Sequence, residues 1–201
     1  MTVLKELKPL SPAAFFDVRV AIPRGDKKRS FKKGTLPDGS GLTGEEYLAK
    51  VSLLWSPTGL FFEVGVKLAI EKGDFLELFI DTRDLKNSNV ITRFCHHFIF
   101  YPEEEKGVEM TRFRGDDSHP LADPSLFSIK TTVKRSSYLM EIEVPKETLY
   151  GYDPLEFKRL GFTYRFQKKN GEKQHFNLSS DFFHIEKHPA LWASLILSEK
   201  K

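Results

Sequence analysis

The chain has 201 residues, a formal net charge of +3, 40% hydrophobic residues and 18 phenylalanines. This apolar content excludes an intrinsically disordered protein, and a domain of this length buries roughly 70% of its unfolded surface without help from a disulfide or a metal. The single cysteine excludes an internal disulfide and a cysteine-rich zinc module. The mild charge neither demands a nucleic-acid partner nor excludes an acidic one.

The N-terminal part of the sequence predicts a cytoplasmic location. It lacks the continuous apolar core of a signal peptide, and no apolar run approaches the length of a membrane span, so we expect no membrane partner. Residues 12–22 predict an opening strand. Residues 23–46, rich in glycine, proline and charge, predict a flexible basic loop within a single domain of residues 1–201. A phosphate-contacting arm is the alternative, but no nucleic-acid-binding signature accompanies the loop, so a nucleic-acid partner is not expected.

From Tyr47 onward the pattern is that of an all-β protein. Paired strands are predicted on either side of two turn signals, Ser-Pro-Thr-Gly at 56–59 and Lys-Asn-Gly at 169–171. Two more strands are expected at 128–136 and 137–145, and a closing strand at 188–198. One short helix is predicted around 146–158, where Pro145 and Pro154 bracket the segment. Many short strands with little helix indicate a sandwich or a barrel.

A central hairpin at about 74–102 organises the predicted sheet. In its first arm the apolar residues Leu76, Leu78 and Ile80 alternate with polar or aromatic residues such as Glu77. This period of two residues is typical of a half-buried strand. In its second arm the alternation places four residues on the apolar face, namely Phe94, His96, Phe98 and Phe100. The opposite face then carries Arg93, Cys95 and His97. Pairing the apolar faces sets Glu77 and Asp81 beside these three residues, and we predict that Glu77 and Cys95 are directly opposed.

The polar face of this hairpin is the candidate chemical site. Cys95, His97 and Glu77 together could bind zinc or form a nucleophile, base and orienting carboxylate. The simpler alternative is a cysteine packed as a small hydrophobe beside an ordinary histidine–glutamate hydrogen bond. His96 lies on the apolar face, where we expect a core histidine with satisfied hydrogen bonds, and adjacent strand residues diverge, so His96 and His97 are not expected to share one metal.

Six stretches in order resemble the family 9 carbohydrate-binding modules and the wider DOMON-like β-sandwiches. The matching pieces are LLWSPTGLFFEVGV, GDFLELFID, RFCHHFIFY, YLMEIEVPKETL, LGFTYRF and HPALWASLIL. The resemblance covers about residues 47–197 and implies a sandwich of two antiparallel sheets. Sugar-binding members hold a terminal sugar between two tryptophans, and the corresponding places carry approximately Glu71 and Glu186 here. The family's carboxylate is matched by Glu77, whereas Cys95 replaces its arginine.

The resemblance therefore implies the scaffold but not the sugar clamp. The two tryptophans present, Trp55 and Trp192, are expected to pack in the core. The resemblance also implies that structural calcium is possible, and the loop 115–123 concentrates three carboxylates, Asp116, Asp117 and Asp123. No haem site is expected, because Met1, Met110 and Met140 offer no convincing axial ligand.

Our leading hypothesis is a non-catalytic binding domain with a family 9 carbohydrate-binding-module-like fold, an unknown ligand or protein partner, and no required cofactor. Carbohydrate remains possible but is disfavoured. The alternatives are a metal-dependent or Cys/His hydrolase that uses Glu77, Cys95 and His97, and a protein-interaction module without a small-molecule site. The candidate ligand-binding residues are Glu77, Asp81, Arg93, Cys95, His97, Arg165 and Glu186.

Overall fold

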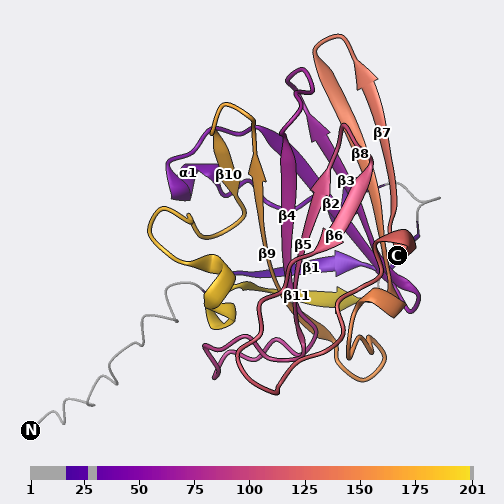
Figure 1. Ribbon diagram of the computed structural model, residues 1–201, viewed down its shortest axis with the longest axis vertical. Coiled ribbons are helices and arrows are strands. Elements are labelled where there is room, and N and C mark those ends of the chain that lie inside the picture. The colour runs from indigo at the N-terminus through magenta and orange to yellow at the C-terminus, as the bar shows by residue number, and fades with distance from the viewer. Residues whose placement is uncertain (1–16, 27–30, 200–201) are drawn as a thin grey trace, which may run out of the picture.

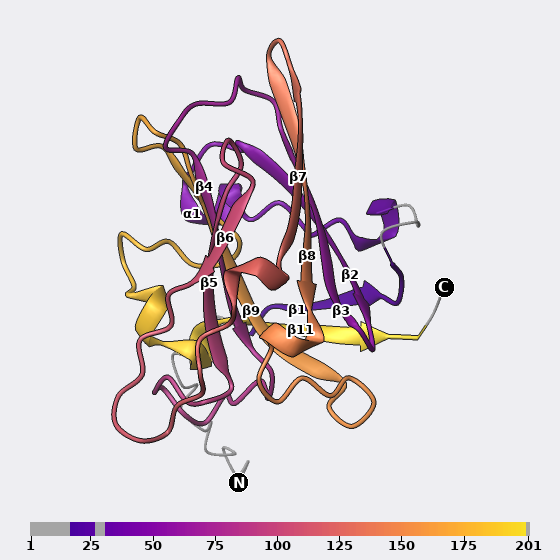
Figure 2. The same ribbon diagram turned by 45° about the vertical axis from the view of Figure 1, so that its right-hand side comes forward.

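Two β-sheets face each other in the computed structural model, which describes residues 17–26 and 31–199 (Figure 1, Figure 2). The larger sheet has the strand order β1 (Arg19–Pro23), β11 (Ala193–Ser198), β9 (Arg159–Gln167), β4 (Phe75–Asp81), β5 (Cys95–Tyr101) and β6 (Lys106–Glu109), with β10 (Lys173–His175) paired to β9. The smaller sheet has the order β2 (Ala49–Ser56), β3 (Gly59–Val66), β8 (Ser137–Pro145) and β7 (Ser128–Lys134). The predicted two-sheet β-sandwich is confirmed.

All strand pairs within the two sheets are antiparallel except β1 and β11, which are parallel. These two strands lie side by side and run across the lower half of both views (Figure 1, Figure 2). The larger sheet is therefore mixed rather than purely antiparallel. The opening strand brings the N-terminal part of the described chain against the closing strand, a pairing that a local sequence pattern does not reveal.

The core lies between the inner faces of the two sheets. Leu76, Leu78 and Ile80 of β4 are fully buried there, as their alternation predicted, and they belong to one cluster with residues of the smaller sheet such as Leu53 and Phe62. The Ser56–Gly59 turn joins β2 to β3 in direct register. The Asn170–Gly171 turn joins β9 to β10, and Gly171 takes the left-handed conformation (φ 94°) that favours glycine.

Helix contributes little to the described part of the chain. There are one α-helical turn, α1 (Ser40–Thr43), and five short 3₁₀ turns, namely η2 (Phe31–Gly34), η3 (Pro124–Leu126), η4 (Lys146–Thr148), η5 (Ile185–Lys187) and η6 (Pro189–Leu191). The helix expected around 146–158 is therefore only the single turn η4. Gly151, with φ 76°, and Pro154 prevent its continuation. No helix in the described residues is long and apolar enough to cross a membrane.

The segment expected to be a flexible basic loop is in part docked on the smaller sheet. Phe31 and Leu36 are buried, and the Leu36 backbone N–H donates to the Val51 carbonyl at 2.9 Å. The expectation of a solvated loop is therefore wrong for residues 31–36, because two apolar side chains within the charged stretch find partners on β2. Residues 27–30, which include Lys27, Lys28 and Arg29, lie outside the described residues. That residues 1–201 form a single domain stays a prediction.

Candidate functional site

The central hairpin keeps its predicted faces but not its predicted register. Glu77 lies opposite Ile99 on β5, and Cys95 lies opposite Asp81. The prediction that Glu77 and Cys95 are directly opposed is therefore wrong by four residues. A shift by an even number of residues leaves every side chain on its own face, so the two residues still share the outer face of the larger sheet.

A compact polar group forms on this outer face around Glu77. The Arg165 guanidinium, directly opposite Glu77 on β9, donates from Nε to Glu77 Oε2, and His97 Nε2 lies 3.0 Å from Glu77 Oε1. Burial alone would raise the pKa of the Glu77 carboxyl, but the hydrogen bonds from His97 and Arg165 outweigh burial and hold that pKa below its usual value. Glu77 is therefore ionised and fixed between two donors.

Apolar rings form the wall beside this polar group. The His97 ring stacks on Phe79 at a centroid distance of 4.3 Å, and Phe79 in turn contacts the Trp192 ring at 5.8 Å. Trp192 is buried, and its indole N–H donates to the Ile185 carbonyl at 2.8 Å. The alternation of β4 places Phe79 between Glu77 and Asp81 on the outer face, so a large ring separates the two carboxylates.

The polar group and these rings line a pocket of about 620 Å³. This volume is within the range of small-molecule sites. Five of the predicted ligand-binding residues line it: Glu77, Cys95, His97, Arg165 and Glu186. The chain region between β6 and η3 closes one side with Arg112, Phe113 and Arg114, and Lys187 of η5 adds a further cation. Four cations and two carboxylates, Glu77 and Glu186, therefore line the pocket.

Asp81 and Arg93, the other two predicted ligand-binding residues, are not among the lining residues of this pocket. Asp81 is buried and caps the turn after β4, where its two oxygens accept from the backbone N–H groups of Arg83 (2.9 Å) and Leu85 (2.7 Å). Burial raises the pKa of Asp81. Arg93 precedes β5 and forms an exposed ion pair with Asp117. Both residues therefore have structural partners.

Cys95 is buried, and no hydrogen bond joins its sulfur to His97 among the contacts of the described residues. The sulfur lies 3.7 Å from Thr92 Oγ1, while His97 directs Nε2 to Glu77. Burial, followed by the nearby Asp81 charge, raises the pKa of the thiol to about 12. A thiol that stays protonated is a poor nucleophile and a poor metal ligand.

The three carboxylates of the predicted calcium loop do not converge. Asp117 pairs with Arg93, and Asp123 accepts from the Ser125 backbone N–H at 2.9 Å at the start of η3. Asp116 is exposed. Within residues 17–26 and 31–199, the group of histidine, cysteine and carboxylate ligands close enough to share one ion is a different one, formed by His96, Glu109 and His119. Glu109 and His119 were missed because the nine residues 110–118 separate them in the sequence.

The places where the resemblance puts the sugar-binding tryptophans are held differently here. Glu71 lies just before β4 and forms an ion pair with Lys168, and Glu186 lies in η5 at the pocket. Both tryptophans of the chain, Trp55 and Trp192, are buried, as the sequence predicted. The cations Arg112, Arg114 and Lys187 could not be assigned to the site from sequence, because loops rather than strand alternation bring them there.

Comparison with known proteins finds structural neighbours only. No family model and no curated protein matches the chain. A family 9 carbohydrate-binding module from Caldicellulosiruptor kristjanssonii, solved with cellotriose and with glucose, superposes with a TM-score of 0.61 at 14% identity and covers 91% of this chain. The match spans 95% of the cellotriose-bound chain and 97% of the glucose-bound chain.

A protein from Bacteroides uniformis ATCC 8492, described only provisionally as carbohydrate-binding, superposes with a TM-score of 0.54 at 11% identity. It covers 90% of this chain, and the match spans 99% of the neighbour. At such identities the likeness concerns architecture and carries no site residue across. The DOMON-like part of the resemblance stays a prediction. The chain has the β-sandwich fold of the family 9 carbohydrate-binding modules.

Proposed function

We propose that this chain is a non-catalytic binding domain and that its ligand occupies the pocket around Glu77, His97 and Arg165. The observation that supports this function is the pocket of about 620 Å³ on the outer face of the larger sheet, lined by a fixed polar group and by apolar rings. Small-molecule sites combine an apolar wall with a few oriented polar groups in this way. A cytoplasmic location, expected from the sequence, is part of this proposal.

The charges around the pocket favour a ligand with an anionic group. Glu77 already accepts hydrogen bonds from His97 and Arg165. The remaining cations, Arg112, Arg114 and Lys187, outnumber the one other carboxylate, Glu186. Because guanidinium groups pair well with carboxylates and phosphates, we propose a hydroxylated organic anion of the size of a monosaccharide acid.

Neutral sugars are poorer candidates for this pocket. Neither tryptophan is accessible for stacking, since both are buried. One face of Phe79 is covered by the His97 ring. A charged Glu186 at the edge of the pocket would have to lose hydration when a neutral ring binds beside it. We therefore propose that the two-tryptophan clamp of sugar-binding members is lost here.

The alternative hydrolase function has little support in this geometry. A hydrolase that used Cys95 would need a thiolate hydrogen-bonded to its base. Here burial raises the pKa of the Cys95 thiol to about 12, and His97 is bonded to Glu77 instead. A pure protein-interaction module would not need a pocket with buried, oriented charges. We therefore favour small-molecule binding over both alternatives.

Titration calorimetry with two sets of ligands tests this function. Glucuronate and galacturonate should bind with saturable heat, whereas glucose, cellobiose and xylose at millimolar concentration should give none. The variants Arg112→Gln and Lys187→Gln should each weaken binding of the acids by roughly tenfold or more, because each removes a charged donor from the pocket. Arg135→Gln, an exposed cation on the β7–β8 turn, is the matched control and should bind like the original chain.

Two results would contradict the proposal. Saturable binding of a neutral sugar at micromolar concentration would restore the neutral-sugar function of the structural neighbours. An equal loss of affinity in Arg112→Gln and Arg135→Gln would show that the anion responds to overall charge rather than to this pocket.

A further inference from the structure

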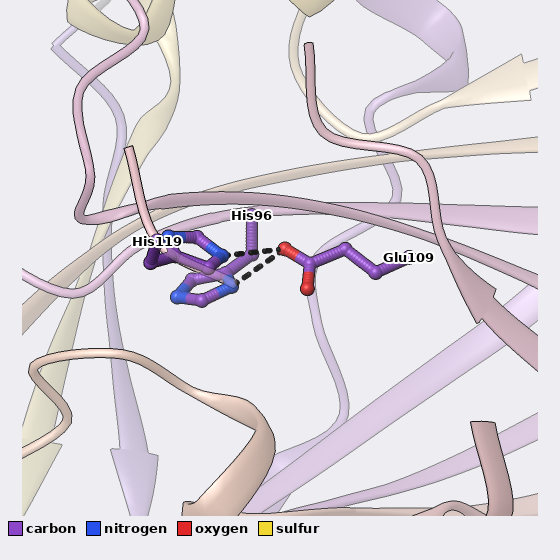
Figure 3. A group of neighbouring side chains, drawn as sticks. All are labelled: His96, Glu109 and His119. Carbon is purple, nitrogen blue, oxygen red and sulfur yellow. Dashed lines mark hydrogen bonds and ion pairs between the residues drawn. The ribbon is translucent and has the colours of Figure 1, made fainter. Parts of the chain in front are cut away.

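His96, Glu109 and His119 form a buried polar cluster that the proposed binding function does not use (Figure 3). His96 lies on β5 and faces the sandwich interior, Glu109 ends β6, and His119 belongs to the loop between β6 and η3. The side chains of His96 and Glu109 are 0% exposed and that of His119 is 2% exposed. A buried carboxylate between two buried imidazoles requires a compensating positive charge.

Both histidine rings point to the same oxygen atom of Glu109 (Figure 3). His96 Nδ1 lies 2.9 Å and His119 Nε2 lies 3.0 Å from Glu109 Oε1. The ligand atoms of the three residues all lie within 4.8 Å of one another. Two imidazole nitrogens therefore converge on one carboxylate oxygen, and the three residues come from three different segments of the chain.

The surroundings hold these ligand atoms in place. Glu109 Oε2 accepts the Ala122 backbone N–H at 2.7 Å, and Thr111 Oγ1 donates to Oε1 at 2.7 Å. His119 Nδ1 lies 2.6 Å from the Arg93 carbonyl oxygen. A backbone carbonyl is one of the usual partners of the second nitrogen of a metal-ligating histidine, because it fixes the tautomer and the ring orientation.

Counting protons shows that the cluster needs a further positive group. The Arg93 carbonyl can only accept, so His119 Nδ1 must carry the hydrogen of that contact. In a neutral ring Nε2 then presents a lone pair to the Glu109 carboxylate oxygen 3.0 Å away, which is repulsive. Either a second proton on His119 or a cation between the two atoms resolves this conflict.

We propose that His96, Glu109 and His119 are the ligands of a divalent transition-metal ion, and that zinc is the ion that suits them best. Two imidazoles and one carboxylate are a set that zinc accepts, with bonds of about 2.0–2.2 Å to each donor atom. Ligand atoms around a tetrahedral zinc lie about 3.4 Å apart. The two nitrogen–oxygen distances of 2.9 and 3.0 Å need to open by only a few tenths of an ångström, and no two of the three ligand atoms are more than 4.8 Å apart. Calcium prefers six or more oxygen ligands and suits this set poorly.

The place of the cluster in the fold indicates what the ion would do. It would join β5 and β6 to the loop that carries His119, and that same chain region supplies Arg112 and Arg114 to the pocket. A three-ligand zinc leaves one coordination position for water or for a fourth group. The ion would thus fix the loop that closes the pocket, whether or not the pocket binds an anion.

The first experiment measures zinc in the full chain prepared without a histidine tag. Because the cluster is buried, the protein is refolded from denaturant with zinc chloride, with calcium chloride or with a chelator, and then dialysed. We expect one zinc per chain by mass spectrometry of the metal, no retained calcium, and a higher Tm for the zinc-loaded sample than for the chelated one. Equal Tm values and no retained zinc in the original chain would overturn the proposal. A second proton on His119 would then be the positive group of the cluster.

Variants then test the ligands. His119→Gln and Glu109→Gln should each lower zinc affinity at least tenfold, while His184→Gln, an exposed histidine, should leave it unchanged. Equal losses in His119→Gln and His184→Gln would show surface binding and overturn the assignment.

Cobalt substitution of the original chain decides the question if the ligand variants fail to fold. Cobalt should give visible ligand-field bands without a near-ultraviolet thiolate band, since Cys95 is not in the cluster. The absence of ligand-field bands, or the presence of a thiolate band, would overturn the assignment of His96, Glu109 and His119 as metal ligands.

Discussion

At the scale of single residues, Glu77 is the most tightly held polar group of the proposed binding site. It is 3% exposed and accepts from His97 and Arg165 on two different neighbouring strands. An ionised carboxylate in this position stabilises the outer face only while both donors remain in place. The residue therefore couples the stability of the sheet to the shape of the pocket.

The lowered pKa of Glu77 predicts how its contribution depends on pH. A carboxyl whose pKa is lower in the folded state than its ordinary value of 4.5 stabilises the fold above that value, and this stabilisation is lost as pH falls through the folded-state pKa. Glu77→Gln should therefore lower the free energy of unfolding by about 1–3 kcal/mol at pH 7. The difference between the two chains should shrink toward pH 3 in urea titrations.

An exposed carboxylate provides the control for this measurement. Glu104→Gln, on the β5–β6 turn, should change the free energy of unfolding by less than about 0.5 kcal/mol at either pH. A difference between Glu77→Gln and the original chain that stays constant from pH 7 to pH 3 would show that Glu77 acts by packing and not by charge.

At the scale of elements, the segment from Phe31 to Leu36 shows how a charged stretch can still be docked structure. Its apolar side chains pack on β2 and β3, and Gly34 passes so close to β2 that an added Cβ would lie 2.2 Å from the Leu53 carbonyl oxygen. Charge and glycine content predicted a mobile loop, because composition does not reveal a close backbone approach. Gly34 is therefore required because a side chain would clash with the backbone of β2, and not because the segment is flexible.

This close approach predicts a difference between Gly34 and Gly41, a glycine outside the docked segment. Gly34→Ala should lower the free energy of unfolding by about 1–3 kcal/mol or more, because the backbone of a buried strand must move to accommodate the methyl group. A Cβ added at Gly41 in α1 would have no atom within 4 Å, so Gly41→Ala should change the free energy of unfolding by less than about 0.5 kcal/mol. Equal values for the two variants in urea denaturation would show that the segment is not docked.

At the scale of the whole molecule, Gln174 of β10 ties the larger sheet to the smaller one. Its Oε1 accepts the backbone N–H groups of Leu48 and Ala49, both at 2.6 Å, and its Nε2 donates to the Ala49 carbonyl at 2.9 Å. The side chain is fully buried. One residue thus satisfies three backbone groups where β2 begins.

Replacing this bridge should destabilise the whole sandwich. Gln174→Leu removes the side-chain partner of two buried N–H groups and of one carbonyl. We therefore expect a loss of about 3 kcal/mol or more in the free energy of unfolding, seen as one shifted transition by both fluorescence and circular dichroism. Gln167→Leu, a half-buried glutamine on β9, is the control and should cost much less. Two separate transitions in the Gln174→Leu variant would argue against residues 1–201 unfolding as one domain.

The sequence determined where most of the strands lie and which side of them faces the core. The expected closing strand is shorter than predicted, because η6 occupies its first part and β11 begins at Ala193. Leu76, Leu78 and Ile80 are buried as their alternation required, and the turns at Pro57 and Gly171 lie where their residue types predicted. These features depend on near neighbours in the chain, whose spacing sets the strand face and the turn type. The alternation also placed Glu77, Cys95 and His97 together on the outer face.

Only the tertiary structure decided how the strands are aligned and which loops meet. An alternation with period two is unchanged when a strand slides by two or four residues, so the pattern could not choose between Cys95 and Ile99 as the partner of Glu77. The same limit applies to the contact of His96 with Glu109 and His119. A long-range contact between a strand and a loop leaves no periodic signal in either segment, because it depends on the packing of the whole chain.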